Sequence, residues 1–357
     1  MKLADWSLAF YRLPYGREVV WSNALESSGL FALLKLVSDD GVTGVAEGTV
    51  KGTWSGVSPR SLRAALEDVI LPAVKDVDLG DAAALSRRFS AIPENRLAKG
   101  LVDNACWTLR AASAQQPLWK LLNGKPAVEL CWTVTRAKPS VMAGEAAEYC
   151  RRHGFRTLKV KGGQGLKTDL EALAAIRAAV DASVELYVDA NGAYPRAEAL
   201  DYVRRIAGAG ATVAEDPCPL APDAAFEALQ RDCGIPILVD GSCTSVRDAE
   251  LYAARGARAV SLKPGRIGIS ESLSIKRLLN ESCTTAVGIY AESALGTLIN
   301  AQLPATLAAE QSFFLTMTSQ VVHAVPEIRG GTIELPDEPD VSRLIDWNAV
   351  KRYSCQP

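Results

Sequence analysis

From about residue 130, short runs rich in apolar and β-branched residues alternate with longer amphipathic segments. This alternation of strand-like and helix-like patterns predicts βα units around a parallel sheet. The units repeat in rhythm only, because the sequence itself does not repeat. The predicted strand and helix pairs are 156–161 with 166–180, 185–189 with 196–209, 212–215 with 224–231, 235–240 with 246–255, 259–263 with 271–280, and 285–289 with 295–309.

The first 125 residues follow another pattern, which predicts a small α+β unit. Apolar runs at 30–37 and 42–47 are joined by Asp39-Asp40-Gly41, a typical hairpin turn. Two helices follow, at 59–74 and 98–122, and a Gly and a Pro shortly after the second predict its end. We therefore expect a domain boundary near residue 125.

Five consecutive predicted strands end in a charged residue. A (β/α) barrel brings the carboxyl ends of its strands to one mouth, where its active site lies. A doubly wound sheet also binds ligands at strand ends, but it concentrates them at one switch point. Five successive strand ends therefore favour the barrel. The residues are Lys161, Asp189, Glu215, Asp240 and Lys263, each 23 to 28 residues after the one before it.

The acids Asp189, Glu215 and Asp240 come from three neighbouring strand ends. Three carboxylates brought together repel one another unless a cation neutralises them, and oxygen-only ligands suit Mg²⁺ or Mn²⁺ rather than zinc. Any one of these acids alone is as easily a helix N-cap or a loop residue. Three in succession predict a divalent-metal site.

Lys159 and Lys161 lie two apart in an apolar run, so that in a strand they point to the same face. On a barrel wall, burial and mutual repulsion would lower the pKa of one lysine and make it a general base. An exposed strand edge is the alternative, because lysines are common there. By strand count, Lys263 lies across the barrel from Lys161. We therefore predict two lysines on opposite faces of a substrate α-carbon, which exchange its proton through an enediolate stabilised by the metal.

The composition narrows the classes of function. The 39 basic and 41 acidic residues leave a net charge of −2 with no long run of either sign, which is unlike a nucleic-acid surface. We expect no signal peptide and no membrane span, because no apolar stretch is long enough for either. Eight dispersed cysteines without a C-x-x-C pair indicate a cytoplasmic protein, and two histidines are too few for an imidazole metal site.

Five motifs carry a resemblance to a known family: Lys159-Val160-Lys161, Asp189-Ala190-Asn191, Glu215-Asp216-Pro217, Asp240 and Lys263. Over nearly its whole length the chain resembles the enolase superfamily, in the muconate lactonizing enzyme subgroup of the mandelate racemase/muconate lactonizing enzyme family. The resemblance implies a modified TIM barrel of (β/α)7β type at 126–320 and an N-terminal α+β capping domain at 1–125. It also implies a C-terminal segment at 321–357 that returns to the capping domain.

The resemblance assigns a role to each candidate residue. Gly241 and Ile269 depart from the subgroup, which usually has Glu and Gly at these positions, and the lack of a nearby histidine argues against the mandelate racemase branch. The implied roles are Lys161 and Lys263 as the acid/base pair, Lys159 as the helper that tunes Lys161 and meets the substrate carboxylate, Asp189, Glu215 and Asp240 as ligands of Mg²⁺ or Mn²⁺, and Asn191 and Glu292 as pocket residues.

In this superfamily, loops of the capping domain close over the barrel mouth and set specificity. The candidate loop is 16–29, with Trp21, Asn23 and Glu26, and it is joined by Lys51 and Trp54. We expect Trp21, Lys51 and Trp54 to bind substrate. An aromatic lid of this kind would exclude water from the enediolate.

Local resemblances divide between two reactions. Segments 48–54, 132–135 and 292–297 resemble muconate cycloisomerases, whereas 98–100 and 263–266 resemble o-succinylbenzoate synthases and N-acylamino acid racemases. We expect a muconate-type cycloisomerase that acts on a small carboxylate and forms a homo-oligomer. The alternatives are an o-succinylbenzoate synthase or N-acylamino acid racemase-like enzyme, a class I aldolase with Lys263 as Schiff-base nucleophile, and a non-catalytic barrel.

Overall fold

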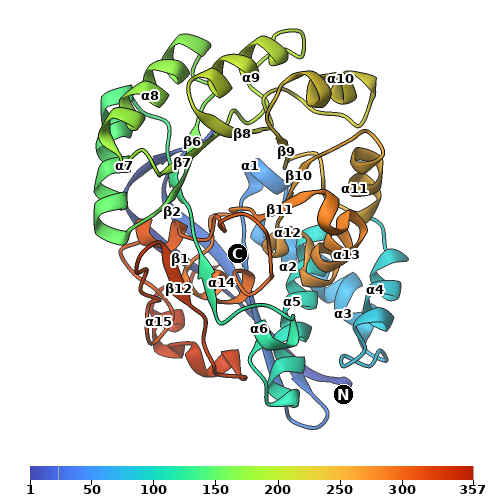
Figure 1. Ribbon diagram of the computed structural model, residues 1–357. Coiled ribbons are helices and arrows are strands. Elements are labelled where there is room, and N and C mark those ends of the chain that lie inside the picture. Colours follow the sequence, from blue (N-terminus) through green and yellow to red (C-terminus); the bar gives the residue numbers. More distant parts are fainter. Residues whose placement is uncertain (23, 357) are drawn as a thin grey trace.

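The computed structural model describes residues 1–22 and 24–356, so that Asn23 of the expected lid and Pro357 lie outside the described residues. It shows a barrel of parallel strands surrounded by helices, with a smaller sheet unit packed against it (Figure 1). The barrel strands pair in sequence order. They are β5 (Trp132–Val134), β6 (Thr157–Lys161), β7 (Glu185–Asp189), β8 (Ala211–Glu215), β9 (Ile237–Val239), β10 (Ala259–Leu262) and β11 (Thr284–Val287).

Helices alternate with these strands, as the rhythm of the sequence predicts, and local signals fix their ends. The carboxylate of Asp223 accepts hydrogen bonds from two backbone N–H groups in the first turn of α10, and Gly154 ends α7 in the left-handed conformation. The barrel helices are α7 (Pro139–His153), α8 (Leu166–Ala179), α9 (Ala199–Gly208), α10 (Ala224–Asp232), α11 (Val246–Ala253), α12 (Pro264–Ile267), α13 (Ile269–Leu279) and α14 (Ala294–Asn300).

The segment 306–310 closes the barrel between β11 and β5. On one side Thr306 and Glu310 donate backbone hydrogen bonds to Thr285 and Val287 of β11, at 2.9 and 2.8 Å. On the other side Cys131 donates to the carbonyl of Ala309 at 2.9 Å. The segment therefore takes the place of the eighth strand in the predicted (β/α)7β barrel.

This closure corrects one prediction. The sequence analysis extends a helix over 295–309, whereas α14 ends at Asn300 and the chain turns through Pro304 into the closing segment. Proline cannot donate the hydrogen bond that a helix interior requires, and it disfavours the helical conformation of the residue before it. Residues 306–310 therefore belong to the barrel wall rather than to a helix face.

The N-terminal unit is an antiparallel sheet in the order β1-β2-β3, covered by helices. Its long helix α5 approaches β3 so closely that a Cβ on Gly44 would lie 2.1 Å from the carbonyl oxygen of Ala105. The elements are β1 (Leu3–Val20), β2 (Leu25–Ser38), β3 (Thr43–Thr49), α1 (Gly52–Ser55), α2 (Pro59–Ala65), a π-helical turn (Leu66–Ile70), α3 (Leu71–Val74), α4 (Ala82–Ser90), α5 (Arg96–Ala114) and α6 (Leu118–Leu121).

Two further boundaries differ from the predictions. The single helix expected at 98–122 is two helices, because Gln115 takes the left-handed conformation and Pro117 follows it. The loop expected at 16–29 is mostly sheet: β1 continues to Val20 and β2 begins at Leu25, with a short connection between them. The lid is therefore the end of a hairpin rather than a long loop.

The last residues of the described chain run back beside the N-terminal unit. Strand β12 (Thr332–Glu334) pairs with β4 (Ala127–Glu129), and α15 (Trp347–Arg352) follows. Beyond α15, the backbone N–H of Cys355 donates to the carbonyl of Phe10 in β1 at 2.9 Å. The boundaries at 125 and 320 stay predictions.

Two simpler observations complete the fold. Within residues 1–22 and 24–356, no helix has both the length and the apolar character that a membrane span requires. All eight cysteines are free, and six of them are buried.

Candidate active site

Strand register places three of the predicted residues in one row. Lys161 is the register partner of Asp189, and Asp189 is the register partner of Glu215. Because neighbouring strands lie about 4.8 Å apart, side chains at paired positions reach one another. The predicted convergence of these strand ends is therefore present in the structure.

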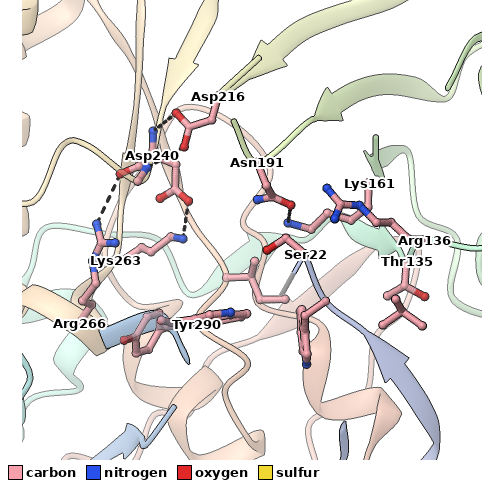
Figure 2. Close-up of a pocket in the computed structure, with 15 residues that line it drawn as sticks. Ser22, Thr135, Arg136, Lys161, Asn191, Asp216, Asp240, Lys263, Arg266 and Tyr290 are labelled. Atoms are coloured by element: carbon pink, nitrogen blue, oxygen red, sulfur yellow. Dashed lines mark hydrogen bonds and ion pairs between the residues drawn. The ribbon is translucent and has the colours of Figure 1, made fainter. Parts of the chain in front are cut away.

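The two lysines predicted as acid and base enter the same cavity from opposite sides, as Figure 2 shows. Nζ of Lys161 lies 2.5 Å from Oδ2 of Asp189, and Nζ of Lys263 lies 2.5 Å from Oδ2 of Asp240. Gly288 makes room for one of them, because a Cβ there would lie 2.9 Å from Cε of Lys263. Each lysine is thus held at the rim by a strand-end carboxylate.

The cavity between the lysines has a volume of about 260 Å³, enough for a small organic acid. Basic and acidic groups line its floor, and aromatic residues from the N-terminal unit and the loop after β11 line its wall (Figure 2). The lining residues are Val20, Trp21, Ser22, Trp54, Thr135, Arg136, Lys161, Asn191, Asp216, Asp240, Gly241, Lys263, Arg266, Ile289 and Tyr290.

Lys159 lies deeper than its partner Lys161 and does not line the cavity. Its side chain is fully buried, and its Nζ lies 2.6 Å from Glu215, 2.8 Å from Glu310 and 3.1 Å from Asp189. The expected mutual repulsion of two adjacent ammonium groups is therefore outweighed by carboxylates. The role of Lys159 as a helper of Lys161 stays a prediction.

The electrostatics of the buried lysines differ from the expectation of a lowered pKa. Burial lowers the pKa of Lys159, but Asp189 and the other acids raise it more, so that the net shift is well upward. The same balance of burial against Asp240 raises the pKa of Lys263. In this arrangement both side chains carry their protons at neutral pH.

The pKa values of two of the acids shift in opposite directions. Burial raises the pKa of Asp189, but Lys159 and Lys161 lower it by more, so that the net shift is downward. For Glu215, burial and the neighbouring charge of Asp189 raise the pKa well above its usual range. Burial and repulsion from the neighbouring acids therefore outweigh the attraction of Lys159, which lies 2.6 Å from Glu215.

Two buried oxygens of the predicted metal ligands lack a hydrogen-bond partner. Oε1 of Glu215 and Oδ1 of Asp240 are buried and accept no hydrogen bond, whereas Oε2 of Glu215 is ion-paired with Lys159 at 2.6 Å. Buried carboxylate oxygens without donors suit a hard divalent cation such as Mg²⁺. The chemistry of these donor atoms therefore fits the predicted ion. Among residues 1–22 and 24–356, no group of three or more His, Cys, Asp or Glu side chains is placed so that it could hold a metal ion.

The remaining predicted pocket residues divide between wall and interior. Asn191 lines the cavity and hydrogen-bonds both Lys161 and Asp189. Glu292 is buried behind the wall, where it accepts a hydrogen bond from the backbone of Tyr290 at 2.8 Å, and burial raises its pKa to about 7. Lys51 also lies behind the wall rather than on it. Substrate binding by these residues stays a prediction.

At Gly241, where the subgroup usually has a glutamate, the backbone contacts the carboxylate of Asp216. The backbone N–H groups of Gly241 and Asp240 both donate to the carboxylate of Asp216, at 2.8 and 3.1 Å. Burial and the charge of Asp240 raise the pKa of Asp216 to about 7. The Arg266 guanidinium contacts the carbonyls of Asp240 and Cys243, so that a positive group remains beside Lys263.

The structure adds site residues that the sequence reasoning did not single out. Glu310 holds Lys159, accepts a hydrogen bond from the Tyr187 hydroxyl at 2.6 Å and accepts another from the backbone of Ile289. Because the sequence analysis predicts a helix up to residue 309, it did not identify the closing segment that carries Glu310. Arg136 lines the cavity just after β5, a strand that the predicted series, which begins at 156, does not include.

We predict that Glu310→Gln lowers both stability and turnover. The substitution removes the charge that faces Lys159 but keeps the shape of the side chain, and disrupting a buried ion pair costs about 3 kcal/mol. Denaturant unfolding measures the first effect, and kcat measured below the unfolding temperature measures the second. Asp103→Asn, a buried acid whose partner Ser270 lies outside the cavity, is the control that should lose stability without losing kcat.

Comparison with known proteins adds independent evidence. Residues 141–346 match the family model for the enolase C-terminal domain-like fold, and residues 19–123 match that of the mandelate racemase/muconate lactonizing enzyme N-terminal domain. Muconate cycloisomerase 1-2 of Acinetobacter lwoffii is 26% identical over 334 residues, covering 90% of this chain and 87% of that protein. The o-succinylbenzoate synthase of Geobacillus stearothermophilus is 28% identical over 347 residues, covering 90% and 88%.

The same relationship holds among solved structures. Muconate lactonizing enzyme from Mucobacterium Smegmatis, solved with muconolactone, superimposes with a TM-score of 0.94 at 23% identity and full coverage of both chains. Fold and site together define a barrel enzyme in which two lysines and a set of strand-end carboxylates meet at one cavity. The chain belongs to the enolase superfamily, in the muconate lactonizing enzyme subgroup of the mandelate racemase/muconate lactonizing enzyme family. The predicted family and fold class are confirmed.

Proposed function

We propose that the protein is a Mg²⁺-dependent muconate-type cycloisomerase, which removes and returns a proton at the carbon next to a substrate carboxylate. The observation that carries the proposal is the placement of Lys161 and Lys263 on opposite sides of one small cavity. The relative from Acinetobacter lwoffii supports the cycloisomerase branch. The cavity volume of about 260 Å³ limits the substrate to a small carboxylic acid.

The metal would be held by the strand-end acids Asp189, Glu215 and Asp240. When bound, the ion supplies positive charge that stabilises the negative charge developing on the substrate carboxylate. Members of the superfamily use Mg²⁺, and the buried Oε1 of Glu215 and Oδ1 of Asp240, which accept no hydrogen bond, support the same ion here.

The lysines do the proton transfer. In the lactone-forming direction, one carboxylate oxygen of the muconate forms a C–O bond to the conjugated chain, and the displaced π electrons give an enediolate at the other carboxylate. A protonated lysine then delivers its proton to the α-carbon, and the free amine receives that proton again in the reverse direction. The raised pKa of Lys263 suits a group that holds its proton until this step.

We expect the aromatic wall of the cavity to exclude water from the reacting carbon. Trp21, Trp54 and Tyr290 line the cavity together with the charged residues, and Trp21 is only 6% exposed. Removing water from this space strengthens each charge interaction with the developing enediolate and prevents its protonation from solvent.

The test is exchange of the α-proton in D₂O, followed by NMR with Mg²⁺ present, over a panel of muconates, muconolactones, acylamino acids and hydroxy acids. We expect exchange and cycloisomerisation with a muconate or its lactone. Exchange confined to acylamino acids would assign the racemase branch instead. Absence of exchange with every carboxylate, with metal shown to be bound, would refute proton abstraction. Borohydride trapping of a substrate on Lys263 in the presence of EDTA would favour an aldolase.

A further inference from the structure

Lys51 is buried in an aromatic cage of the N-terminal unit. It follows strand β3, its side chain is 4% exposed, and its Nζ lies 3.7 Å from the ring centre of Trp21 and 4.0 Å from that of Trp54. Oε2 of Glu26 completes the cage at 2.6 Å from Nζ. An ammonium group held between two indole faces and a carboxylate is a specific arrangement, because each contact fixes a direction.

The cage links three neighbouring ends of one sheet. Trp21 follows β1, Glu26 lies on β2, and Lys51 follows β3, so that the connections at this end of the sheet meet at one ammonium group. The indole N–H of Trp21 donates to the same Oε2 of Glu26 at 2.9 Å. Lys51 and Trp21 therefore share one carboxylate oxygen, and neither can turn without breaking a contact of the other.

The two indoles that enclose Lys51 also form part of the cavity wall. Their rings meet edge to face, with centroids 4.9 Å apart and planes at 85°. The ring of Trp21 packs against that of Phe313, with centroids 5.0 Å apart, and the ring of Trp54 packs against that of Tyr290, with centroids 5.6 Å apart. Trp21 and Trp54 line the cavity, whereas Lys51 lies behind them and does not.

Stability alone does not account for a lysine at this position. Burial lowers the pKa of Lys51 to about 8, with Glu26 opposing the shift and Lys161 adding to it, so the site bears a desolvation cost. An apolar side chain of similar length would fill the space without that cost, since replacing buried charges by hydrophobic groups is often neutral or stabilising. What an apolar side chain cannot do is orient both indoles and the carboxylate at once.

We propose that Lys51 is a positioning residue for substrate specificity, which fixes the indoles of Trp21 and Trp54 as a rigid wall for the non-reacting part of the substrate. The inference rests on the proposed function only for its kinetic readout. A rigid wall of two aromatic faces selects a flat or unsaturated group, because such a group packs against both rings without loss of rotational freedom.

The test compares Lys51→Met with Lys51→Arg, which keeps the cation. In Lys51→Met we expect KM to rise about tenfold with kcat changed less, and Lys51→Arg to restore most of the loss. Hydroxyl-radical footprinting resolved to single residues gives a readout independent of turnover, and it separates oxidation of Trp54 from that of the methionine introduced nearby. Oxidation of Trp21 and Trp54 should increase in Lys51→Met, while oxidation of the buried Trp132 stays unchanged.

Lys35→Met is the matched control, because Lys35 lies over the ring of Trp347 at 5.8 Å, away from the cavity. It should leave KM unchanged. If Lys51→Met raises KM while the oxidation of both tryptophans stays at the wild-type level, Lys51 contacts substrate directly and the proposal is wrong. If both KM and oxidation stay at wild-type levels, it is also wrong. If the wild-type enzyme exchanges no α-proton, the proposed function fails, and the footprinting result still decides the role of Lys51.

Discussion

Lys161→Ala and Lys263→Ala should each lower kcat by a factor of about 10²–10⁴, which is the usual contribution of a positioned acid or base. The two side chains reach the cavity from opposite sides, so that neither can replace the other at its own face of the α-carbon. Steady-state kinetics on the substrate identified by exchange in D₂O measures the loss.

The two variants should differ in which proton they still exchange. With an α-chiral substrate, each single variant should keep exchange from the face served by the remaining lysine and lose it from the other. NMR of each enantiomer in D₂O resolves this. If both variants lost exchange from both faces while still folded, the two-sided arrangement would be contradicted.

Lys167→Ala is the control for lysine removal as such. Its side chain is 90% exposed on α8, where it lies 3.8 Å from Glu171, and an exposed pair of this kind contributes little. This variant should keep wild-type kcat. A loss there comparable to that in Lys161→Ala would indicate a general effect of surface charge.

The row of strand-end residues was predictable because one βα unit has a narrow range of lengths. Regular spacing from Lys161 to Lys263 required only that each predicted strand end at its charged residue, and the parallel register then aligned Lys161, Asp189 and Glu215. These inferences depend on local periodicity and on the fixed geometry of parallel strands, which sequence carries directly.

The environment of Lys159 was not predictable in the same way. Sequence shows two lysines on one face of a strand, and repulsion between them follows only if no acid is near. Glu215 lies on β8 and Glu310 on the segment that closes the barrel, so both contacts with Lys159 join parts of the chain that are far apart in sequence. The raised pKa of Lys159 is therefore a tertiary property.

The lid shows a second limit. Residues 16–29 contain glycines and polar residues that indicate a loop, but pairing with β2 extends β1 to Val20. Strand pairing over long hairpins overrides local propensity. Trp21 and Trp54 line the cavity, and their contact with substrate stays a prediction, whereas the position of Lys51 behind them required side-chain geometry.

Removal of divalent metal should abolish α-proton exchange, and Mg²⁺ or Mn²⁺ should restore it. The reason lies in two buried carboxylate oxygens, Oε1 of Glu215 and Oδ1 of Asp240, which accept no hydrogen bond within the protein and would gain a partner from the cation. Dialysis against EDTA followed by addition of each metal tests this. Binding should also stabilise the fold, by about 2.7 kcal/mol when the metal is at a hundred times its Kd, so that thermal unfolding provides a measurement without substrate.

Glu215→Gln should weaken Mn²⁺ binding, measured by calorimetry or by electron paramagnetic resonance, and should remove the metal-dependent stabilisation. Asp169→Asn is its matched control. This buried acid accepts hydrogen bonds from the backbone N–H of Gly163 and from the hydroxyls of Tyr194 and Tyr202, so that its carboxylate is already hydrogen-bonded within the protein. Metal affinity should be unchanged in Asp169→Asn. If the wild-type chain bound neither ion at millimolar concentration, the strand-end acids would serve only as partners of the lysines, and a metal-independent reaction would have to be sought.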